Sequence, residues 1–574
     1  MLATLPPAVI EAESQRIALL AKIKTALLAI FDPAGQGGGS GVVISADGFA
    51  LSNFHVVQPC GTAMKCGMPD GRVYDCVVVG LDPTGDVALV QVLGRDDFPH
   101  AELGDSDLLR PGDPVFALGN PFLLAADFQP TVTAGIVSGV HRYQFPEGTL
   151  LEYADCIQTD ASINPGNSGG PLFDGRGRLV GINGRCSFDK RGRVSVNVGY
   201  AVSINQIKNF LGDLRSGRIV DHATLGARVA ADEQGQVVVS DVLEQSDAYR
   251  RGLRVDDELV RFAGRRVATP NGFKNVLGIL PKGWRVPLSY RREGKLYDVL
   301  VRLSGVHGKE QLLERVMGHA PQPMPLPPPG EEPRGKKRGE PKPLIPRPDL
   351  PLPVQLSRAK PPMPEIVKRH FEEKHGYANY YYNRREQERV LGSWKMPAEI
   401  KPLAGPWTVS GRLEHGGGFR LRLTDSEAML EAPIGDCRWT AAGPWAGSLL
   451  PAGSNGLLPA LCLWRRLVLQ GPAGFSPLDY RGTAPLPGRE TLADVVVGSY
   501  RGVEGWFFFD PAGGQLLALE MYADEHADPC EIYFSQYRDA DGRTLPGRME
   551  VRAGDTWFGT FLLDEFDFRE APKT

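Results

Sequence analysis

Short apolar runs separated by turn residues dominate residues 32–216. The runs are rich in β-branched side chains, which is typical of strands rather than helices. They cover Val42–Ser45, Phe49–Ser52, Val73–Val79, Val87–Val92, Val115–Leu118, Thr131–Ser138, Cys156–Thr159, Pro171–Phe173, Leu179–Ile182 and Val198–Val202. Short strands with frequent turns favour β-barrels over an α/β sheet, and Gln206–Leu214 has the spacing of a closing helix.

Residues 1–31 carry a different pattern. Apolar residues recur there at helical spacing between Ile17 and Leu28. Charged residues precede or interrupt them, among them Glu11, Glu13, Lys22 and Lys24. We expect an amphipathic N-terminal helix, because a secretory signal has a basic start followed by an uncharged apolar run. The sequence therefore shows no export address, and no run approaches the ~18 uncharged apolar residues of a membrane span.

Proline dominates the stretch after residue 305. Residues 321–364 hold 16 of the 48 prolines. Such a composition cannot build a packed core, so we expect residues 305–365 to form a solvated, extended linker. In the polyproline II conformation, residues 321–364 would reach on the order of 100 Å and decouple residues 366–574 from the rest of the chain.

Alternation of apolar and polar residues returns in residues 366–574 and predicts a predominantly antiparallel β domain. The predicted strands are Phe419–Leu423, Gly505–Asp510, Leu516–Tyr522, Glu531–Tyr537, Met549–Arg552 and Thr556–Asp564. The final run, from Tyr537 to Gly554, faintly resembles the curved sheets of lipoprotein carriers. No catalytic constellation is visible in this part, so substrate capture or envelope scaffolding are the roles to test.

Ser168 lies in the segment Asn164-Pro-Gly-Asn-Ser-Gly-Gly-Pro-Leu172, with glycines on both sides. A serine hydroxyl acts as a nucleophile only with a base to take its proton and donors to hold the oxyanion. Glycines permit the tight turn and the close substrate approach that such a site needs. Because serine-glycine loops are also common turns, the assignment requires partners elsewhere in the chain.

His55 and Asp86 are the candidate partners. His55 lies in Asn53-Phe-His-Val-Val, just after a predicted strand. Asp86 lies in Thr84-Gly-Asp-Val-Ala-Leu, at the mouth of the next apolar strand, and Asp82 is the competing carboxylate. The order His, Asp, Ser is that of chymotrypsin-like double barrels, whereas subtilisins and α/β-hydrolases use other orders.

Together the three segments resemble the HtrA/Deg serine proteases over roughly the first half of the chain. The resemblance implies a trypsin-like protease domain over residues 32–216, folded as a chymotrypsin-like double β-barrel. It implies that Ser168 attacks a peptide carbonyl, that His55 transfers the proton, and that Asp86 orients His55. The backbone N–H groups of Gly166 and Ser168 are the expected oxyanion donors.

Specificity and activation are expected to depend on residues around this loop. Enzymes that mature by cleavage carry an aspartate where Asn167 stands, so a neutral side chain here favours activation by loop ordering. The resemblance assigns Ile163 and Tyr200 to the substrate pocket, and Ile163 suggests a preference for small aliphatic side chains. Ser203 replaces the family's proline and leaves one wall of the pocket less constrained. The basic segment Lys190–Arg193 is expected to be a solvated hairpin tip.

Residues 221–304 resemble a PDZ domain. The segment around Leu225 and Gly226 resembles a carboxylate-binding loop, whose N–H groups receive the C-terminus of a peptide. The strand Val237–Val242 and a helix capped by Thr269 complete the expected groove. A PDZ fold without a ligand is the alternative.

Composition limits the remaining possibilities. The net charge of −4 and the pI near 6.3 give no electrostatic case for binding nucleic acid. Disulfides among Cys60, Cys66 and Cys76 stay open, whereas their spacing does not match the usual zinc ligands. We expect no metal and no cofactor.

The leading hypothesis is an endopeptidase that degrades unfolded or damaged proteins and recognises peptide C-termini. The alternatives are a non-enzymatic chaperone or adaptor that holds polypeptide clients, and an interaction protein whose residues 366–574 do the main work. The resemblance implies a homotrimer with contacts from residues 1–31. It also implies a periplasmic or envelope location, and the missing signal segment leaves a cytoplasmic location open.

Overall fold

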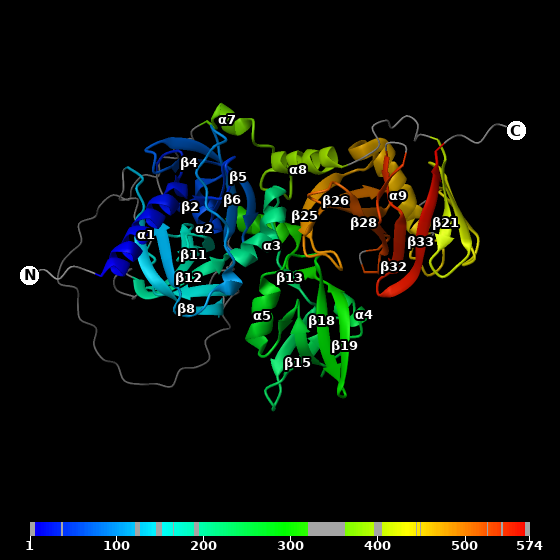
Figure 1. Cartoon of the computed structure of the whole chain (residues 1–574), viewed down its shortest axis with the longest axis horizontal. Helices are drawn as coiled ribbons and strands as arrows, with labels where there is room; N and C mark the ends of the chain where they lie inside the picture. The colour runs from blue at the N-terminus through cyan, green and yellow to red at the C-terminus, as the bar shows by residue number, and fades with distance from the viewer. Residues whose placement is uncertain are drawn as a thin grey trace, which may run out of the picture.

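The computed structural model shows a predominantly β protein in which two barrels, a smaller middle unit and a C-terminal sheet lie side by side (Figure 1). The structure describes residues 6–35, 38–120, 127–144, 152–164, 166–188, 195–318, 362–394, 405–442, 445–447, 449–524, 526–540 and 543–568. The two closed six-stranded antiparallel barrels confirm the predicted double β-barrel. Within the described ranges, no helix has the length and apolar character needed to cross a membrane.

The first barrel closes in the order β1-β2-β3-β6-β5-β4. Its strands are β1 (Leu27–Phe31), β2 (Gly39–Val43), β3 (Phe49–Ser52), β4 (Ala63–Gly67), β5 (Val73–Asp82) and β6 (Val87–Val92). The expected helix over residues 1–31 is wrong in its second part. Helix α1 (Pro7–Ile23) ends earlier, and after the 3-10 turn η1 (Lys24–Ala26) the chain enters β1. Because β1 pairs with both β2 and β4, closing the barrel overrides the helical spacing of Leu27 and Leu28.

The second barrel closes in the order β10-β11-β12-β9-β8-β7. Its strands are β7 (Pro114–Gly119), β8 (Thr131–Gln144), β9 (Tyr153–Thr159), β10 (Pro171–Asp174), β11 (Leu179–Phe188) and β12 (Ser195–Ser203). Every strand predicted in this part falls within an observed one. Helix α3 (Ile204–Arg215) follows, and the Ser203 hydroxyl caps it by accepting the Gln206 N–H at 3.4 Å.

The middle unit comprises residues 221–304 and contains a sheet of order β14-β15-β16-β18-β19, with β17 on β16. Its elements are β13 (Ala223–Thr224), β14 (Ala227–Ala231), β15 (Val237–Val242), α4 (Asp247–Arg250), β16 (Glu258–Phe262), β17 (Arg265–Arg266), α5 (Pro270–Gly278), β18 (Arg285–Arg292) and β19 (Lys295–Arg302). Thr269 caps α5 as expected, accepting the Gly272 N–H at 2.9 Å. β20 (Ser304–Gly305) pairs with β13, and α6 (Lys309–Val316) follows it. The predicted linker therefore starts too early, and residues 319–361 lie outside the described residues.

The C-terminal unit, residues 366–568, is built on an eleven-stranded sheet of order β24-β23-β22-β21-β33-β32-β29-β28-β27-β26-β25. Its strands are β21 (Trp407–Leu413), β22 (Gly418–Leu423), β23 (Glu427–Glu431), β24 (Cys437–Thr440), β25 (Leu478–Ala484), β26 (Ala493–Tyr500), β27 (Val503–Phe509), β28 (Leu516–Tyr522), β29 (Cys530–Ser535), β32 (Arg548–Ala553) and β33 (Thr556–Asp567), with a separate pair β30 (Arg538–Ala540) and β31 (Arg543–Leu545). The helices are α7 (Glu365–Lys368), α8 (Tyr380–Ser393) and α9 (Leu457–Gln470). This antiparallel sheet confirms the predicted β-rich class.

Six cysteines of the described residues are free thiols: Cys60, Cys66, Cys76, Cys437, Cys462 and Cys530. Burial raises the pKa of Cys60 to about 11, so this thiol stays protonated and unreactive near neutral pH.

The C-terminal unit is packed against the rest of the protein, so the expected decoupling is wrong. One hydrophobic cluster joins Trp284 and Val286 of the middle unit to Trp506 and Phe508 of the sheet. The Trp284 indole N–H also donates to the carbonyl oxygen of Thr483 at 2.8 Å. Burying apolar area in common is the main force for such association. The middle and C-terminal units therefore share a core.

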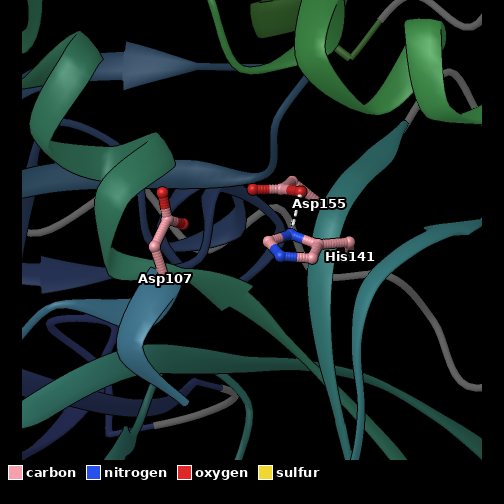
Figure 2. A group of neighbouring side chains, drawn as sticks. All are labelled: Asp107, His141 and Asp155. Carbon is pink, nitrogen blue, oxygen red and sulfur yellow. Dashed lines mark hydrogen bonds and ion pairs between the residues drawn. The ribbon is translucent and has the colours of Figure 1, made fainter. Parts of the chain in front are cut away.

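An ionic joint connects the second barrel to the middle unit. Asp107 in η3 (Ser106–Leu108), His141 in β8 and Asp155 in β9 converge there, and Figure 2 shows His141 turned toward Asp155. Arg265 of β17 places Nη1 3.0 Å from both oxygens of Asp155 and Nη2 2.9 Å from one oxygen of Asp107. The three residues are of metal-binding types, but the guanidinium already supplies the positive charge that two carboxylates need. The cluster is therefore a set of ion pairs between the second barrel and the middle unit.

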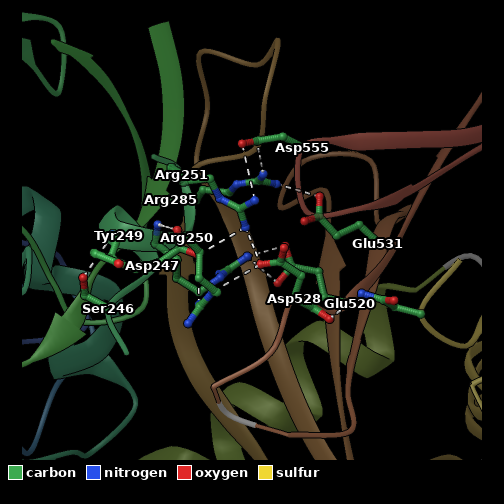
Figure 3. A network of polar contacts seen from close by, with 12 residues as sticks. Ser246, Asp247, Tyr249, Arg250, Arg251, Arg285, Glu520, Asp528, Glu531 and Asp555 are labelled. Carbon is green, nitrogen blue, oxygen red and sulfur yellow. Dashed lines mark hydrogen bonds and ion pairs between the residues drawn. The ribbon is translucent and has the colours of Figure 1, made fainter. Parts of the chain in front are cut away.

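Charged side chains also join the middle unit to the C-terminal sheet, and Figure 3 shows arginines of the one facing acids of the other. Arg285 lies 2.6 Å from Glu531, and Arg302 makes two contacts of 2.8 and 2.9 Å with Glu520. The Glu531 and Glu520 side chains are only 1% and 3% exposed. A buried carboxylate depends strongly on such a partner, because it has lost its hydration.

His222 links the middle unit to the last residue of β5. Its Nε2 lies 2.8 Å from Asp82 Oδ2, and its Nδ1 lies 2.7 Å from the carbonyl oxygen of Gly278 in α5. Both partners only accept hydrogen bonds, so both contacts require the doubly protonated ring. Burial lowers the pKa of His222, but the charge of Asp82 and the two hydrogen bonds outweigh it and hold the pKa above its usual value.

Replacing Arg302 with alanine is expected to lower the free energy of unfolding by ~3–5 kcal/mol, because Glu520 stays buried without its counter-charge. Urea unfolding followed by tryptophan fluorescence measures the loss as an earlier midpoint. In the control Arg291→Ala, the ion pair with Glu258 is partly exposed, at 39% and 22% for the two side chains, and we expect a change below ~1 kcal/mol. Equal losses in the two variants would contradict the dependence of the interface on the buried pair.

The protonated His222 ring should make stability pH-dependent. Since its folded pKa lies above the unfolded value near 6.5, its contribution is fully present below about pH 6.5 and is lost as the pH rises through the folded pKa. Melting temperatures of wild type and His222→Gln, measured from about pH 5.5 to 8.5, should converge as the pH rises. The exposed His100→Gln variant should follow the wild type throughout, and a constant gap between His222→Gln and wild type would refute the assignment.

Candidate active site

His55 and Asp86 come from adjoining ends of the first barrel. β3 leads directly into the short helix α2 (Phe54–Val57), which carries His55. Asp86 ends the loop between β5 and β6, and β3 pairs with β6 through Ser52 and Ala88. The pairing brings the two segments together although the residues are 31 positions apart. Asp86 adopts the left-handed conformation (φ +57°), which aspartate tolerates better than most residues.

The carboxylate of Asp86 holds the imidazole of His55. His55 Nδ1 lies 2.8 Å from Oδ2 and 3.0 Å from Oδ1, and the His55 backbone N–H donates to Oδ1 at 3.0 Å. The Asp86 side chain is 0% exposed, whereas that of His55 is 40% exposed. A carboxylate accepts here, so Nδ1 carries the proton and Nε2 remains available for a reacting partner.

Asp82 takes a different place. Its Oδ1 accepts the N–H groups of Thr84 and Gly85, and its Oδ2 faces His222. Of the two carboxylates considered from the sequence, the structure therefore brings Asp86, not Asp82, to His55.

The basicity of His55 is set by two opposing effects. Burial lowers the pKa of His55, while the charge of Asp86 and its hydrogen bond to the ring raise it. The net pKa lies above the ordinary histidine value of 6.5. A ring with such a pKa can accept a proton from a hydroxyl and be stabilised as imidazolium.

Ser168 comes from the second barrel, in the loop between β9 and β10. Its carbonyl oxygen accepts the Ser40 N–H of β2 at 2.9 Å, which fastens the loop to the first barrel. Glycine is required beside it, because a Cβ on Gly169 (φ +83°) would lie 2.2 Å from the Ser40 carbonyl oxygen and 3.1 Å from the Asn53 nitrogen. The serine loop therefore lies against the segment that carries His55.

The Ser168 hydroxyl donates to the carbonyl oxygen of Gly184 at 3.3 Å. Across the described residues, no hydrogen bond joins this hydroxyl to the His55 ring. Catalytic contacts often form only with substrate, so this arrangement suits a resting site.

The two predicted oxyanion donors lie in the same loop. Gly166 adopts a left-handed conformation (φ +101°), and its carbonyl accepts the Ser40 hydroxyl at 2.6 Å. This contact turns the carbonyl toward the first barrel. In the part of the chain that the structure describes, neither the Gly166 nor the Ser168 N–H has an acceptor, so both are free to bind a substrate oxygen.

The structure also places the remaining residues predicted from the resemblance. Ile163 is 0% exposed and packs beside Gly199, where an added Cβ would lie 2.7 Å from its Cδ1. Tyr200 is half-buried in β12, next to Gly199. Asn167 is buried and its amide lies 3.5 Å from the Ser162 carbonyl oxygen. The segment Lys190–Arg193 lies outside the described residues.

The loop at the start of the middle unit has the expected glycine conformation. Gly226 has φ +71°, and Leu225 is 2% exposed within the core of the unit. The Gly226 N–H is already bonded to the Thr224 hydroxyl at 3.1 Å. A ligand carboxylate would have to displace that hydroxyl.

Two residues around Asp86 were not predicted from the sequence. The Tyr153 hydroxyl donates to Asp86 Oδ2, and the Asn53 side chain donates to the Asp86 backbone carbonyl at 2.9 Å. Tyr153 begins β9 and looks like an ordinary strand aromatic. Asn53 lies two residues before His55. This position was the only feature of the sequence that could have indicated its contact with Asp86.

Known proteins resemble the first half of the chain. Residues 39–182 match the family model described as a trypsin-like peptidase domain. A probable periplasmic serine endoprotease DegP-like of Chlamydia trachomatis serovar D is 32% identical over 301 residues, 50% of this chain and 58% of the relative. The periplasmic serine endoprotease DegP of Escherichia coli K12 is 35% identical over 278 residues, 46% of this chain and 56% of the relative. A solved structure, HtrA-type protease AlgW with tripeptide, is 29% identical with a TM-score of 0.43, covering 51% of this chain and 98% of that one.

The first half of the chain is therefore similar to HtrA/DegP-like, trypsin-like serine proteases, in agreement with the three sequence segments. The chain spans little more than half the length of the curated relatives it matches. The matched family model ends at residue 182, before the middle and C-terminal units.

The raised pKa of His55 predicts the acidic limb of the activity profile. Since the base must be neutral, kcat/KM should fall as the pH drops through that pKa, above pH 6.5. Asp86→Asn removes the charge that raises the pKa, so the limb should move to lower pH while kcat falls by roughly 10⁴. Hydrolysis of a denatured protein measured from about pH 5 to 9 tests both effects.

The control for this variant is Asp75→Asn, which removes a carboxylate of β5 paired with Lys65 rather than with a histidine. Its pH profile should match the wild type. An unchanged limb in Asp86→Asn would show that Asp86 does not set the basicity of His55.

Proposed function

We propose, from the HtrA-like trypsin-type peptidase region in the first half of the chain, that this protein is a serine endopeptidase. It hydrolyses peptide bonds of unfolded or damaged polypeptides through His55, Asp86 and Ser168. The single observation that carries the proposal is the buried Asp86 carboxylate bonded to His55 Nδ1, beside a serine loop fastened to the same barrel.

The mechanism begins with a rotation of the serine hydroxyl. Ser168 Oγ leaves the Gly184 carbonyl and turns to His55 Nε2, which takes its proton as the oxygen attacks the substrate carbonyl. Asp86 keeps the Nδ1 proton in place and stabilises the imidazolium. His55 then gives its proton to the leaving amine, and water releases the acyl group by the same steps in reverse. The free N–H groups of Gly166 and Ser168 hold the oxyanion at each stage.

We assign the pocket for the substrate side chain to the region of Ile163 and Tyr200. The buried Ile163 side chain packs directly against Gly199, where an added Cβ would lie 2.7 Å from its Cδ1, so this part of the site is apolar. A small aliphatic side chain fits such a site best, since it buries apolar area without an unpaired polar group.

The middle unit acts in this proposal as a PDZ domain that binds peptide C-termini. Its support is the glycine turn at Gly226, the strand β14 after it, and helix α5 packed near that strand. The N–H groups of Leu225 and Gly226 receive the terminal carboxylate, and the peptide extends along β14. Unfolded chains and peptide C-termini are thus the proposed partners.

The oligomeric state and the cellular location of the protein are inferred from its resemblance to known proteases. We infer a homotrimer in which α1 contributes contacts, because Val9, Ile10 and Ile17 on this helix are 48%, 50% and 60% exposed. We infer a location in the cell envelope, since the curated relatives are periplasmic by name.

Loss of Ser168 should abolish hydrolysis. Wild type is expected to cleave a denatured protein and to be labelled by a fluorophosphonate probe, whereas Ser168→Ala should lose at least ~10³-fold in rate and all labelling. His55→Ala should behave in the same way. Gel analysis of substrate and probe measures both effects.

Ser45→Ala is the matched control, since this serine bonds to Asp47 in a turn of the first barrel. It should keep full activity and labelling. A wild-type protein that suppresses aggregation of a denatured client but neither cleaves it nor takes the label would instead be a chaperone or adaptor.

A further inference from the structure

Tyr153 connects the acid of the proposed triad to the serine side of the site. It is the first residue of β9 in the second barrel and is 3% exposed. Its hydroxyl crosses to the first barrel and donates to Asp86 Oδ2. The same carboxylate oxygen lies 2.8 Å from His55 Nδ1. Tyr153 therefore touches the group that orients the base.

The hydrogen bond matters because Asp86 has no contact with solvent. A buried carboxylate keeps its charge only where donors surround it. Those donors, within the described residues, are the His55 backbone and ring, and the Tyr153 hydroxyl. Without the hydroxyl, the Asp86 carboxylate would be held by His55 alone, and its charge would act more strongly on the imidazole.

The ring of Tyr153 packs against the serine side. A Cβ added to Gly184 would lie 2.6 Å from Tyr153 Cε1 and 2.9 Å from its hydroxyl oxygen. Gly184 is the residue whose carbonyl accepts the Ser168 hydroxyl at 3.3 Å. The absence of a side chain at position 184 thus lets one tyrosine reach both Asp86 and the backbone that holds Ser168.

The strand that carries Tyr153 is itself clamped. Two residues further along β9, the Asp155 N–H donates to the Asn275 side chain of α5 at 2.9 Å, and its carboxylate is held by Arg265. Ala154, between them, lies in the hydrophobic cluster of the middle unit. These contacts fix the start of β9, so the Tyr153 hydroxyl is pre-positioned.

We propose that Tyr153 is a positioning residue of this serine protease site, which fixes the Asp86 carboxylate through its hydroxyl and the Gly184 carbonyl through its ring. The inference rests on the proposed function, since it assigns a role within the same triad. In this role Tyr153 acts on the triad through Asp86 and Gly184.

Tyr153→Phe tests the hydroxyl alone, because the ring is kept. We expect kcat to fall about 10-fold with KM nearly unchanged, since the lost bond serves the reacting groups rather than substrate binding. The acidic limb of kcat/KM should move up by roughly 0.5–1 pH unit, because the less solvated carboxylate holds the His55 proton more tightly. Tyr153→Leu also removes the ring contact and should lose a further ~10-fold in kcat.

Tyr143→Phe is the matched control. This half-buried tyrosine lies on the neighbouring strand β8 and donates to Glu152, away from the triad. Its kcat and pH profile should equal those of wild type. A Tyr153→Phe enzyme with an unchanged pH limb, or with activity reduced only in proportion to the fraction folded, would overturn the proposal.

A readout without catalysis separates this inference from the proposed function. In the full chain carrying Ser168→Ala, the His55 ring can be titrated by NMR after histidine-selective carbon-13 labelling. Adding Tyr153→Phe should raise the midpoint of that titration whether or not the parent protein hydrolyses peptides. An inactive wild type with the shifted midpoint would refute only the protease function, and an active wild type with no shift would refute only the role of Tyr153.

Discussion

The buried carboxylate of Asp86 sets the requirement that the catalytic region satisfies. Its side chain is 0% exposed, and an ionised group in such surroundings needs donors from the protein. The backbone and ring of His55 in α2 donate hydrogen bonds to this carboxylate, and so does the hydroxyl of Tyr153 in β9. One charge therefore ties both barrels to the loop between β5 and β6. It also fixes the His55 ring with Nδ1 toward the acid and leaves Nε2 for chemistry.

The seam between the barrels depends on positions without side chains. Ser168 reaches the first barrel because its carbonyl bonds to Ser40 and because Gly169 can approach the Ser40 backbone closely. Gly184 admits the ring of Tyr153 in the same way. Each glycine loses more conformational entropy on folding than other residues do. Its missing side chain, however, lets the two barrels approach closely enough to form one site.

The other units are held by charges as well as by apolar packing. Arg265 and His222 fasten the middle unit to the barrels, while a shared hydrophobic cluster and buried arginine pairs fasten it to the C-terminal sheet. Buried ion pairs add little net stability, but removing one partner is costly, so they favour one docking geometry. The middle unit thus contacts both the barrels and the C-terminal sheet, and β9 carries both Tyr153 and the Asp155 that binds Arg265 of this unit.

Local patterns in the sequence indicated most strands of the two barrels, the cap at Thr269 and the candidates His55, Asp86 and Ser168, because alternation, turn residues and short motifs act over a few positions. They also indicated the family, since three motifs in one order are specific. Tertiary structure alone decided that Leu27–Phe31 is a strand, that α6 replaces the start of the expected linker, and that the C-terminal sheet is docked rather than free. It placed Asp86 rather than Asp82 at His55, in agreement with the sequence, and it alone brought Tyr153 to the same carboxylate. The physical reason is that barrel closure, burial of charge and shared cores depend on residues far apart in the chain, and no short-range pattern records which of them will meet.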